Sequence, residues 1–136
     1  MVTALIRRFY ENREGSEKLV VWGDGSPLRE ITYGQDIARA FLWCLDNYDN
    51  EQTLNIGSTE EMSVKDIAYS IADILHINRG RIVFDTTKPS GVFRKSTDNS
   101  KFINLSKFSY GSIRETLQKT IDYFCAHYPD PQKLRL

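Results

Sequence analysis

Apolar residues recur every three or four positions in four segments of the chain, which is the spacing of one face of a helix. The first of these stripes runs from Val2 to Phe9 and includes Leu5 and Ile6. The other three are formed by Ile37, Ala40, Phe41, Cys44, Leu45 and Tyr48, by Val64, Ile67, Ala68, Ile71, Ala72 and Leu75, and by Ile113, Leu117, Ile121, Phe124 and Cys125. Each stripe predicts an amphipathic helix.

Local sequence signals fix the ends of the last two helices. A serine followed three residues later by an acid occurs at 63–66 and at 112–115, and this spacing is typical of a helix start. Pro129 and Pro131 are expected to end the last helix. The second helix differs because Ala38, Leu42 and Trp43 widen its apolar arc, so we expect it to be covered on more than one side.

Short apolar runs between the helices predict strands at 19–22, 29–33, 53–56 and 81–84. Residues 85–96 are rich in Thr, Pro, Ser and Gly and predict a long loop, a kind of segment that often carries function. Helices alternating with short strands indicate an α/β fold with parallel pairing. The chain of 136 residues is expected to form one domain, 1–136.

Composition narrows the class of partner. The chain has 18 basic and 18 acidic residues, so its net charge is zero and argues against a nucleic-acid-binding surface. Its two cysteines, Cys44 and Cys125, are too few for a disulfide scaffold and are expected to be buried free thiols. The sequence contains no apolar run long enough for a membrane span, and the first ten residues lack the pattern of a signal peptide. We therefore expect a cytoplasmic protein with no membrane partner.

No complete catalytic set is evident. His76 and His127 have no cysteine or acid at metal-ligand spacing, so no metal site is predicted. The segment Gly23–Gly25 follows a strand but leads to another strand rather than into a helix, which predicts a turn and not a dinucleotide-binding loop.

Isolated basic residues remain, and they are ordinarily solvated surface. Arg29 is distinctive because it follows Pro27 at a strand start, and a guanidinium can fork onto phosphate oxygens. Arg8 shares a helix face with Met1 and Leu5, which suits either a ligand with a sugar and a phosphate or an ordinary packed helix. The other candidates are Lys88, Arg94 and Lys95.

The chain resembles the extended short-chain dehydrogenase/reductase family from Ala4 to Tyr128. The resemblance lies in the ordered motifs at 20–30, 36–40, 54–57 and 83–95, the last of which is similar to the branch of NADPH-dependent epimerase/reductases that act on GDP-4-keto-6-deoxy-D-mannose. It implies that the chain is a small C-terminal substrate-binding domain with short parallel strands and about four main helices.

The resemblance also implies the site residues. The residues that match the substrate-binding positions of the family are Met1, Leu5, Arg8, Trp22, Arg29 and Lys95. Ser90 stands where the family commonly has an acid that contacts substrate, and serine is shorter and uncharged. The expected partner is a GDP-sugar.

The family's glycine fingerprint, catalytic Ser and Tyr-x-x-x-Lys pair, and its epimerisation Cys and His, would all precede Met1. We therefore expect no catalytic, cofactor-binding or metal-binding residue and no N-terminal Rossmann domain in this chain. NADP(H) would serve the complete enzyme, which is expected to be a homodimer, and would not bind this chain tightly. With no cofactor domain to cover the second helix, the chain is expected to be marginally stable or to self-associate. The alternatives are a non-catalytic remnant or interaction module, and a related nucleotide-sugar epimerase or dehydratase.

Overall fold

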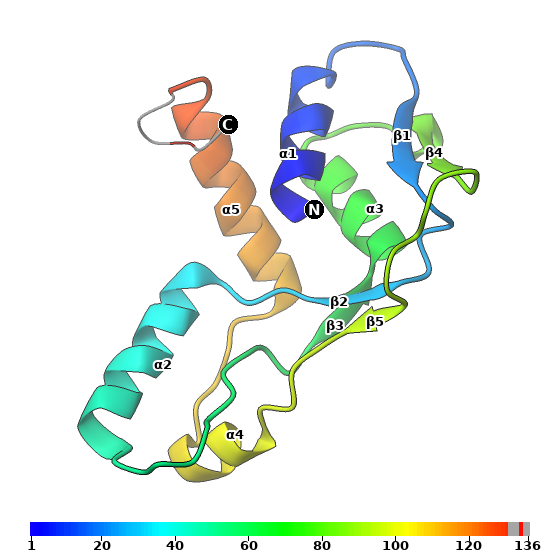
Figure 1. Cartoon of the computed structure of the whole chain (residues 1–136). Helices are drawn as coiled ribbons and strands as arrows, with labels where there is room; N and C mark the ends of the chain where they lie inside the picture. The colour runs from blue at the N-terminus through cyan, green and yellow to red at the C-terminus, as the bar shows by residue number, and fades with distance from the viewer. Residues whose placement is uncertain (131–133, 135–136) are drawn as a thin grey trace.

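The computed structural model describes residues 1–130 and 134, so the predicted helix-ending Pro131 lies outside the described residues. Figure 1 shows the order and arrangement of the elements. None of the helices in residues 1–130 is long and apolar enough to cross a membrane. The elements are α1 (Val2–Glu11), β1 (Leu19–Trp22), β2 (Leu28–Glu30), α2 (Gly34–Asn47), β3 (Glu61–Ser63), α3 (Val64–Ile74), the 3-10 turn η1 (Arg79–Arg81), β4 (Ile82–Asp85), β5 (Arg94–Lys95), α4 (Ser100–Ser106) and α5 (Ile113–His127).

The main core lies between α1, α3 and α5 and is closed on one side by β1 and β4 (Figure 1). Each helix turns its predicted apolar stripe inward, and the residues from these stripes that are almost completely buried are Ile6, Phe9, Ile67, Ala68, Ile71, Ala72, Ile113, Leu117 and Ile121. Three of the four predicted stripes therefore build the core. Burying these side chains is the main stabilising contribution, at roughly 1.5–3 kcal/mol for each large aliphatic or aromatic residue.

The strands form two small sheets. β1 pairs with β4 in parallel, with Leu19 opposite Ile82. β2 lies at the centre of the second sheet, antiparallel to β3 and parallel to β5. The predicted α/β fold with short parallel strands is confirmed, and the antiparallel β2–β3 pair is an addition that the sequence did not suggest.

The predicted helix starts are confirmed. The Ser63 hydroxyl accepts a hydrogen bond from the Asp66 backbone N–H at 3.0 Å. At α5 the Ser112 hydroxyl accepts from the Glu115 N–H at 3.2 Å, while the Glu115 carboxylate accepts from the Ser112 N–H at 3.2 Å. This reciprocal capping satisfies N–H groups that have no partner within a first helical turn.

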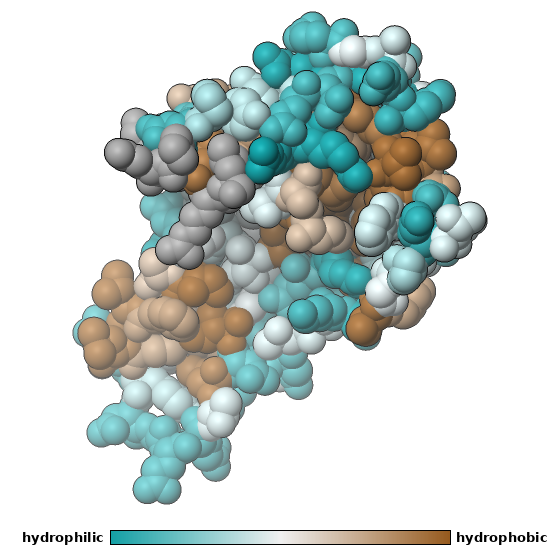
Figure 2. All heavy atoms as spheres, turned by 45° about the horizontal axis from the view of Figure 1, so that its top comes forward, coloured by the Kyte–Doolittle hydropathy of each residue, from teal (hydrophilic) through white to brown (hydrophobic). Residues whose placement is uncertain are grey.

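Helix α2 lies apart from the main core (Figure 1), and it carries an exposed apolar face. Phe41, Leu42 and Leu45 are 60%, 63% and 82% exposed, so the predicted stripe of this helix is not buried at Phe41 and Leu45. Figure 2 shows an apolar patch at the end of the molecule where α2 lies. Trp43 is half-buried instead, because its ring packs edge-on against Phe102 of α4.

Two of the strand predictions were wrong, one in its bounds and one in predicting a strand that does not form. The strand predicted at 29–33 is shorter and lies at 28–30, and the strand predicted at 53–56 is absent. A strand pattern becomes a strand only where a neighbour supplies hydrogen-bonding partners, and no strand in residues 1–130 pairs with 53–56. The sequence also missed α4 and the short strands β3 and β5, the last of which lies inside the predicted loop 85–96.

The two cysteines are free, as predicted, but they are only half-buried, so the prediction that they are buried was wrong. Burial nevertheless raises the pKa of both the Cys44 and the Cys125 thiol. The neutral thiol is therefore favoured at both positions, which makes neither a good nucleophile.

Candidate functional site

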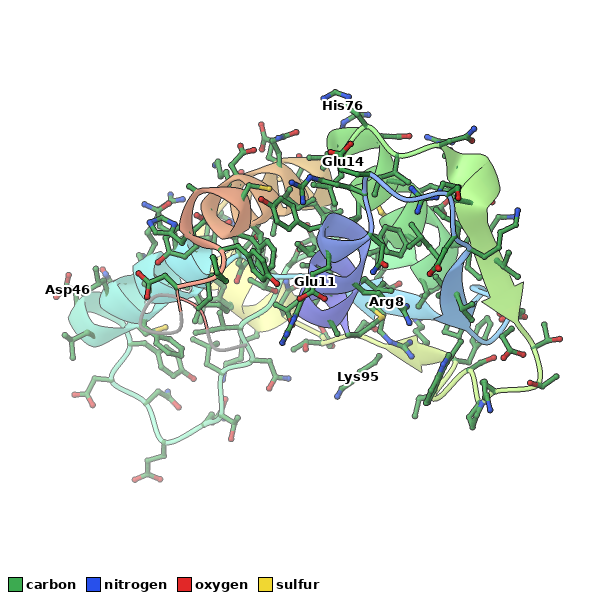
Figure 3. All side chains as sticks on the ribbon, turned by 90° about the horizontal axis from the view of Figure 1, so that it is seen from above. Arg8, Glu11, Glu14, Asp46, His76 and Lys95 are labelled. Carbon is green, nitrogen blue, oxygen red and sulfur yellow. The ribbon has the colours of Figure 1, made fainter. Side chains whose placement is uncertain are left out.

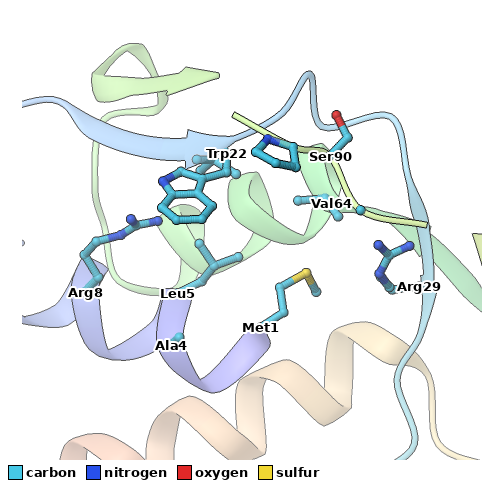
Figure 4. A pocket seen from close by; sticks show the side chains of 11 residues that line it. Met1, Ala4, Leu5, Arg8, Trp22, Arg29, Val64 and Ser90 are labelled. Atoms are coloured by element: carbon cyan, nitrogen blue, oxygen red, sulfur yellow. The ribbon is translucent and has the colours of Figure 1, made fainter. Parts of the chain in front are cut away.

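A cavity of about 520 Å³ opens between α1, the end of β1 and the loop after β4 (Figure 4). Its walls come from segments that are far apart in the sequence. They are Met1, Ala4, Leu5, Arg8, Val21, Trp22, Arg29, Val64, Pro89, Ser90 and Gly91. A concave, mainly apolar pocket with a few polar groups is the usual form of a small-molecule site.

Helix α1 supplies one wall. Met1, Leu5 and Arg8 follow each other at helical spacing, and all three line the cavity, as the sequence predicted for one face. The opposite face of the same helix buries Ile6 and Phe9 in the core. The wall is therefore anchored by the packing behind it.

Arg8 carries a positive charge that has no counter-ion among residues 1–130. Its guanidinium is half-buried, and the Nε atom has no hydrogen-bond partner in that range. Burial lowers the pKa of Arg8 below its ordinary value, although an arginine stays protonated. A half-buried unpaired guanidinium costs free energy that an anion bound in the cavity would offset.

Arg29 lies at the other end of the cavity from Arg8 in Figure 4. Its Nη1 donates to the Leu28 carbonyl at 2.6 Å, which orients the guanidinium along its own strand. The two arginines thus share one cavity but are not side by side.

Lys95 lies in a neighbouring cavity of about 420 Å³, and Met1 and Arg29 line both cavities. Arg29 and Lys95 are register partners in the parallel β2–β5 pair. Like charges on adjacent strands repel each other, and neither cation forms an ion pair within the described part of the chain. The pair is an arrangement that an anion would stabilise. Figure 3 shows the Lys95 side chain extending away from the body of the protein.

Trp22 is the aromatic part of the site. It is 61% exposed at the end of β1, and its indole borders the cavity beside Leu5 (Figure 4). An exposed indole of this kind offers a flat surface on which a nucleobase can stack.

The turn after β1 and the loop after β4 touch each other. Gly23 has a φ of +82°, and a Cβ at this position would come within 2.5 Å of the Ser90 Oγ. Only glycine fits this close approach without strain. The predicted turn at 23–25 is confirmed, since it leads into β2 and not into a helix.

The structure places the residues predicted from the sequence as follows. Six of them line the first cavity, namely Met1, Leu5, Arg8, Trp22, Arg29 and Ser90, and Lys95 lines the second. Arg94 belongs to neither cavity, because it pairs with Glu61 at 2.9 Å. Sequence reasoning missed Val64, Gly91 and Glu30, and for Glu30 its place directly after Arg29 was the available signal.

The turn at 23–25 does not have the form of a dinucleotide-binding loop. The one glycine-rich turn that follows a strand, 23–25, presents no helix N-terminus to a pyrophosphate, because β2 follows it. Residues 1–130 also contain no group of three or more His, Cys, Asp or Glu side chains that could hold a metal ion. The two cavities, with the cations that line them, are suited to binding an anionic ligand.

Comparison with known proteins shows a partial match to one class of enzymes. Residues 1–57 match the model of the NAD dependent epimerase/dehydratase family, which agrees with the resemblance to extended short-chain dehydrogenases/reductases found in the sequence. Within that class the chain is similar to the GDP-L-fucose synthases. It is 38% identical to GDP-L-fucose synthase 1 of Arabidopsis thaliana over 125 residues, which cover 91% of this chain and 38% of the plant protein. The GDP-L-fucose synthase of Escherichia coli K12 is 29% identical, over 91% of this chain and 41% of the bacterial protein.

A solved structure gives the same result. The GDP-L-fucose synthetase of Naegleria fowleri, crystallised with NADP, superposes with a TM-score of 0.88 at 31% identity and covers 95% of this chain and 41% of the amoebal chain. The predicted resemblance is therefore confirmed. The chain spans about two fifths of the length of these relatives.

Proposed function

We propose that this chain binds the GDP-sugar in a GDP-L-fucose synthase, the enzyme that converts GDP-4-keto-6-deoxy-D-mannose to GDP-L-fucose with NADPH. The observation that carries the proposal is the gathering of two guanidiniums without a carboxylate partner among residues 1–130 and an exposed indole around one cavity, with a third cation next to it. A nucleoside diphosphate sugar has the matching parts, which are a flat base, two phosphates and a hydroxyl-rich ring.

The two cavities support a particular placement of the ligand. The base stacks on Trp22 in the more apolar cavity, within reach of Arg8. The diphosphate lies at the junction between the cavities, where Arg29 and Lys95 are strand neighbours. The sugar then extends into the second cavity, which Ser96 and Thr97 make more polar. Ser90 offers a hydroxyl at the wall of the first cavity.

Hydride transfer belongs to the part of the enzyme that has no counterpart here. In the full reaction the keto-sugar is epimerised at C3 and C5, and C4 then takes a hydride from NADPH and a proton from an acid. This chain's role is to hold the nucleotide so that the sugar reaches that centre. By itself it would neither bind NADPH tightly nor oxidise it.

The apolar face of α2 supports a docking role for the same missing part. Phe41 and Leu45 form a groove with Leu54 and Ile56, and the latter two lie in a segment with a strand pattern but no strand partner among residues 1–130. An unpaired strand pattern beside an exposed apolar helix is what a domain shows when its neighbouring sheet is absent. We therefore place the cofactor domain against this groove, in an enzyme that is homodimeric and cytoplasmic.

Calorimetry tests the binding role. GDP and GDP-mannose should bind the isolated chain, while UDP should bind more weakly and inorganic pyrophosphate weakest, because it lacks the base. Equal affinity for UDP and GDP would favour a related epimerase or dehydratase instead. If none of these ligands bound, the alternative of a non-catalytic remnant would be favoured.

Titration with the remaining portion of the Arabidopsis relative tests the docking role. The wild-type chain should bind that portion, and Phe41→Gln with Leu45→Gln should abolish the interaction without changing the affinity for GDP. Unchanged binding of the double variant would place the interface elsewhere on the chain.

A further inference from the structure

Lys95 is carried by the least supported strand of the protein. β5 contains only Arg94 and Lys95, and both side chains are exposed. The strand pairs with β2, the Leu28 N–H donates to the Phe93 carbonyl at 2.8 Å just before it, and Arg94 pairs with Glu61 of β3 at 2.9 Å. A two-residue edge strand needs further support if its lysine is to keep a fixed position.

The carboxylate of Glu30, which lies on β2, supplies that support at the C-terminal end of β5. Its Oε2 accepts a hydrogen bond from the Thr97 backbone N–H at 2.7 Å, two residues beyond Lys95. Its Oε1 accepts from the Thr32 hydroxyl at 3.0 Å. Both oxygens are thus occupied by donors of the protein, and the carboxylate joins the end of β2 to the chain that leaves β5.

The carboxylate is itself fixed in place. The backbone at Gly57 lies so close to it that any side chain at that position would collide with the Glu30 oxygens. The Thr32 hydroxyl in turn accepts from the Ser58 N–H at 2.8 Å, and the amide of Asn99 donates to the Gly57 carbonyl. Three segments of the chain therefore meet at this carboxylate.

Glu30 also faces the cations without pairing with either. It lines the same cavity as Arg29 and Lys95, yet it makes no ion pair within the described residues. We propose that Glu30 is a positioning residue that holds β5, and with it Lys95, in the geometry that receives the diphosphate. This inference rests on the proposed function, since it concerns how the same site is kept in order.

Simple electrostatics makes the opposite prediction. A carboxylate beside an anion site repels the ligand, so its neutralisation should tighten GDP binding and shortening it should change little. A positioning role depends on reach instead of charge. Glu30→Asp keeps the charge but draws the carboxylate back from Thr97, while Glu30→Gln removes the charge and keeps an oxygen that can accept the Thr97 N–H.

Calorimetry with GDP on the full chain therefore separates the two accounts. Glu30→Asp should weaken binding roughly tenfold, as expected when a charge-assisted contact to phosphate is misplaced, and Glu30→Gln should stay within about twofold of wild type. Glu14→Asp is the matched control, because it makes the same change at a carboxylate that is almost fully exposed and pairs with its neighbour Arg13, away from β5. It should have little effect.

A double-mutant cycle tests whether Glu30 acts through Lys95. The variant Glu30→Asp/Lys95→Ala should bind GDP no more weakly than Lys95→Ala alone, since there is no lysine left to position. Amide hydrogen exchange gives a measurement that needs no ligand: the Thr97 N–H should lose protection in Glu30→Asp while the α3 amides keep theirs.

The outcomes separate cleanly. Three results would each overturn the positioning role and leave the proposed function standing. The first is a cycle in which the two losses of affinity multiply, and the second is unchanged exchange protection of the Thr97 amide in Glu30→Asp. The third is tighter GDP binding by Glu30→Gln with no change in Glu30→Asp. No GDP binding by the wild-type chain would overturn both together.

Discussion

Arg29 and Lys95 face each other across the β2–β5 pair, one strand apart, and neither forms an ion pair with a carboxylate among the described residues. Two neighbouring cations destabilise a sheet unless a ligand neutralises them. The arrangement is therefore easier to explain as a prepared anion site than as part of the scaffold.

Arg29→Ala should weaken GDP binding by roughly tenfold to a hundredfold, the range expected for hydrogen bonds to a charged group. The matched control is Arg79→Ala, because Arg79 is exposed, is already paired with Asp73 at 2.8 Å and lines neither cavity. Calorimetry on both variants checks the prediction. Equal losses of affinity in the two variants would mean that GDP binding depends only on the net charge of the chain.

Tryptophan fluorescence should report on the base. The chain has two tryptophans. Trp22 lines the cavity, while Trp43 of α2 packs against Phe102 of α4. GDP should quench the emission of wild type and of Trp43→Phe, but not that of Trp22→Phe. Trp22→Ala should weaken GDP binding by about 1–3 kcal/mol, the usual worth of one stacked base. Quenching that survives in Trp22→Phe would place the base elsewhere.

Gly23→Ala should disturb both stability and binding. The alanine would adopt a positive φ, at a cost of about 1–2 kcal/mol, and its Cβ would press on Ser90 and move the loop that forms one cavity wall. Gly34→Ala is the control, since a Cβ there meets no other atom within 4 Å and alanine favours a helix. Urea denaturation and GDP titration should show losses for the first variant only.

The link between α1 and α5 should make stability depend on pH in the acid range. The Tyr128 hydroxyl donates to the Glu11 carboxylate at 2.6 Å and Arg7 donates to it at 2.9 Å, and these bonds hold the pKa of Glu11 below its usual value. A carboxyl with a lowered pKa in the folded state contributes stability that is present above its unfolded pKa of about 4.3. That contribution is lost as the pH falls through the folded pKa.

Thermal melts from pH 6 down to pH 3 test this link. The wild type should lose Tm on acidification more steeply than Glu11→Gln, because the glutamine has no proton to gain. Glu14→Gln is a suitable control, since Glu14 is almost fully exposed and pairs only with its neighbour Arg13. Parallel curves for wild type and Glu11→Gln would show that other carboxyls govern the acid transition.

The exposed face of α2 should drive self-association of the isolated chain. Phe41→Gln and Leu45→Gln should shift the chain toward monomer in sedimentation experiments and change the free energy of unfolding by no more than about 0.5 kcal/mol. Leu105→Gln on α4 removes a comparable exposed side chain outside the α2 groove and should leave association unchanged. A wild-type chain that stays monomeric at high concentration would contradict the prediction.

The sequence was sufficient for features that depend on local chemistry. Helical periodicity located α1, α3 and α5, and the serine caps at 63 and 112 fixed two helix starts to the residue. It failed where structure depends on a distant partner. The 53–56 segment has the composition of a strand but no neighbour, while β5 becomes a strand only because β2 lies beside it.

The candidate site divides in the same way. Resemblance to a family located Arg8, Trp22 and Arg29, since motifs keep their order along a chain. Backbone contacts such as the one between Gly23 and Ser90, and the bonds of Glu30 to Thr97, leave no periodic trace and required the structure.

The aromatic cluster formed by Trp43, Phe102, Phe108 and Tyr110 joins α2 to α4, and it is separate from the main core between α1, α3 and α5. Two small cores in one chain can open independently, so unfolding need not be a single cooperative event. The α2–α4 end can therefore fray and re-form while the cavity beside α1 persists.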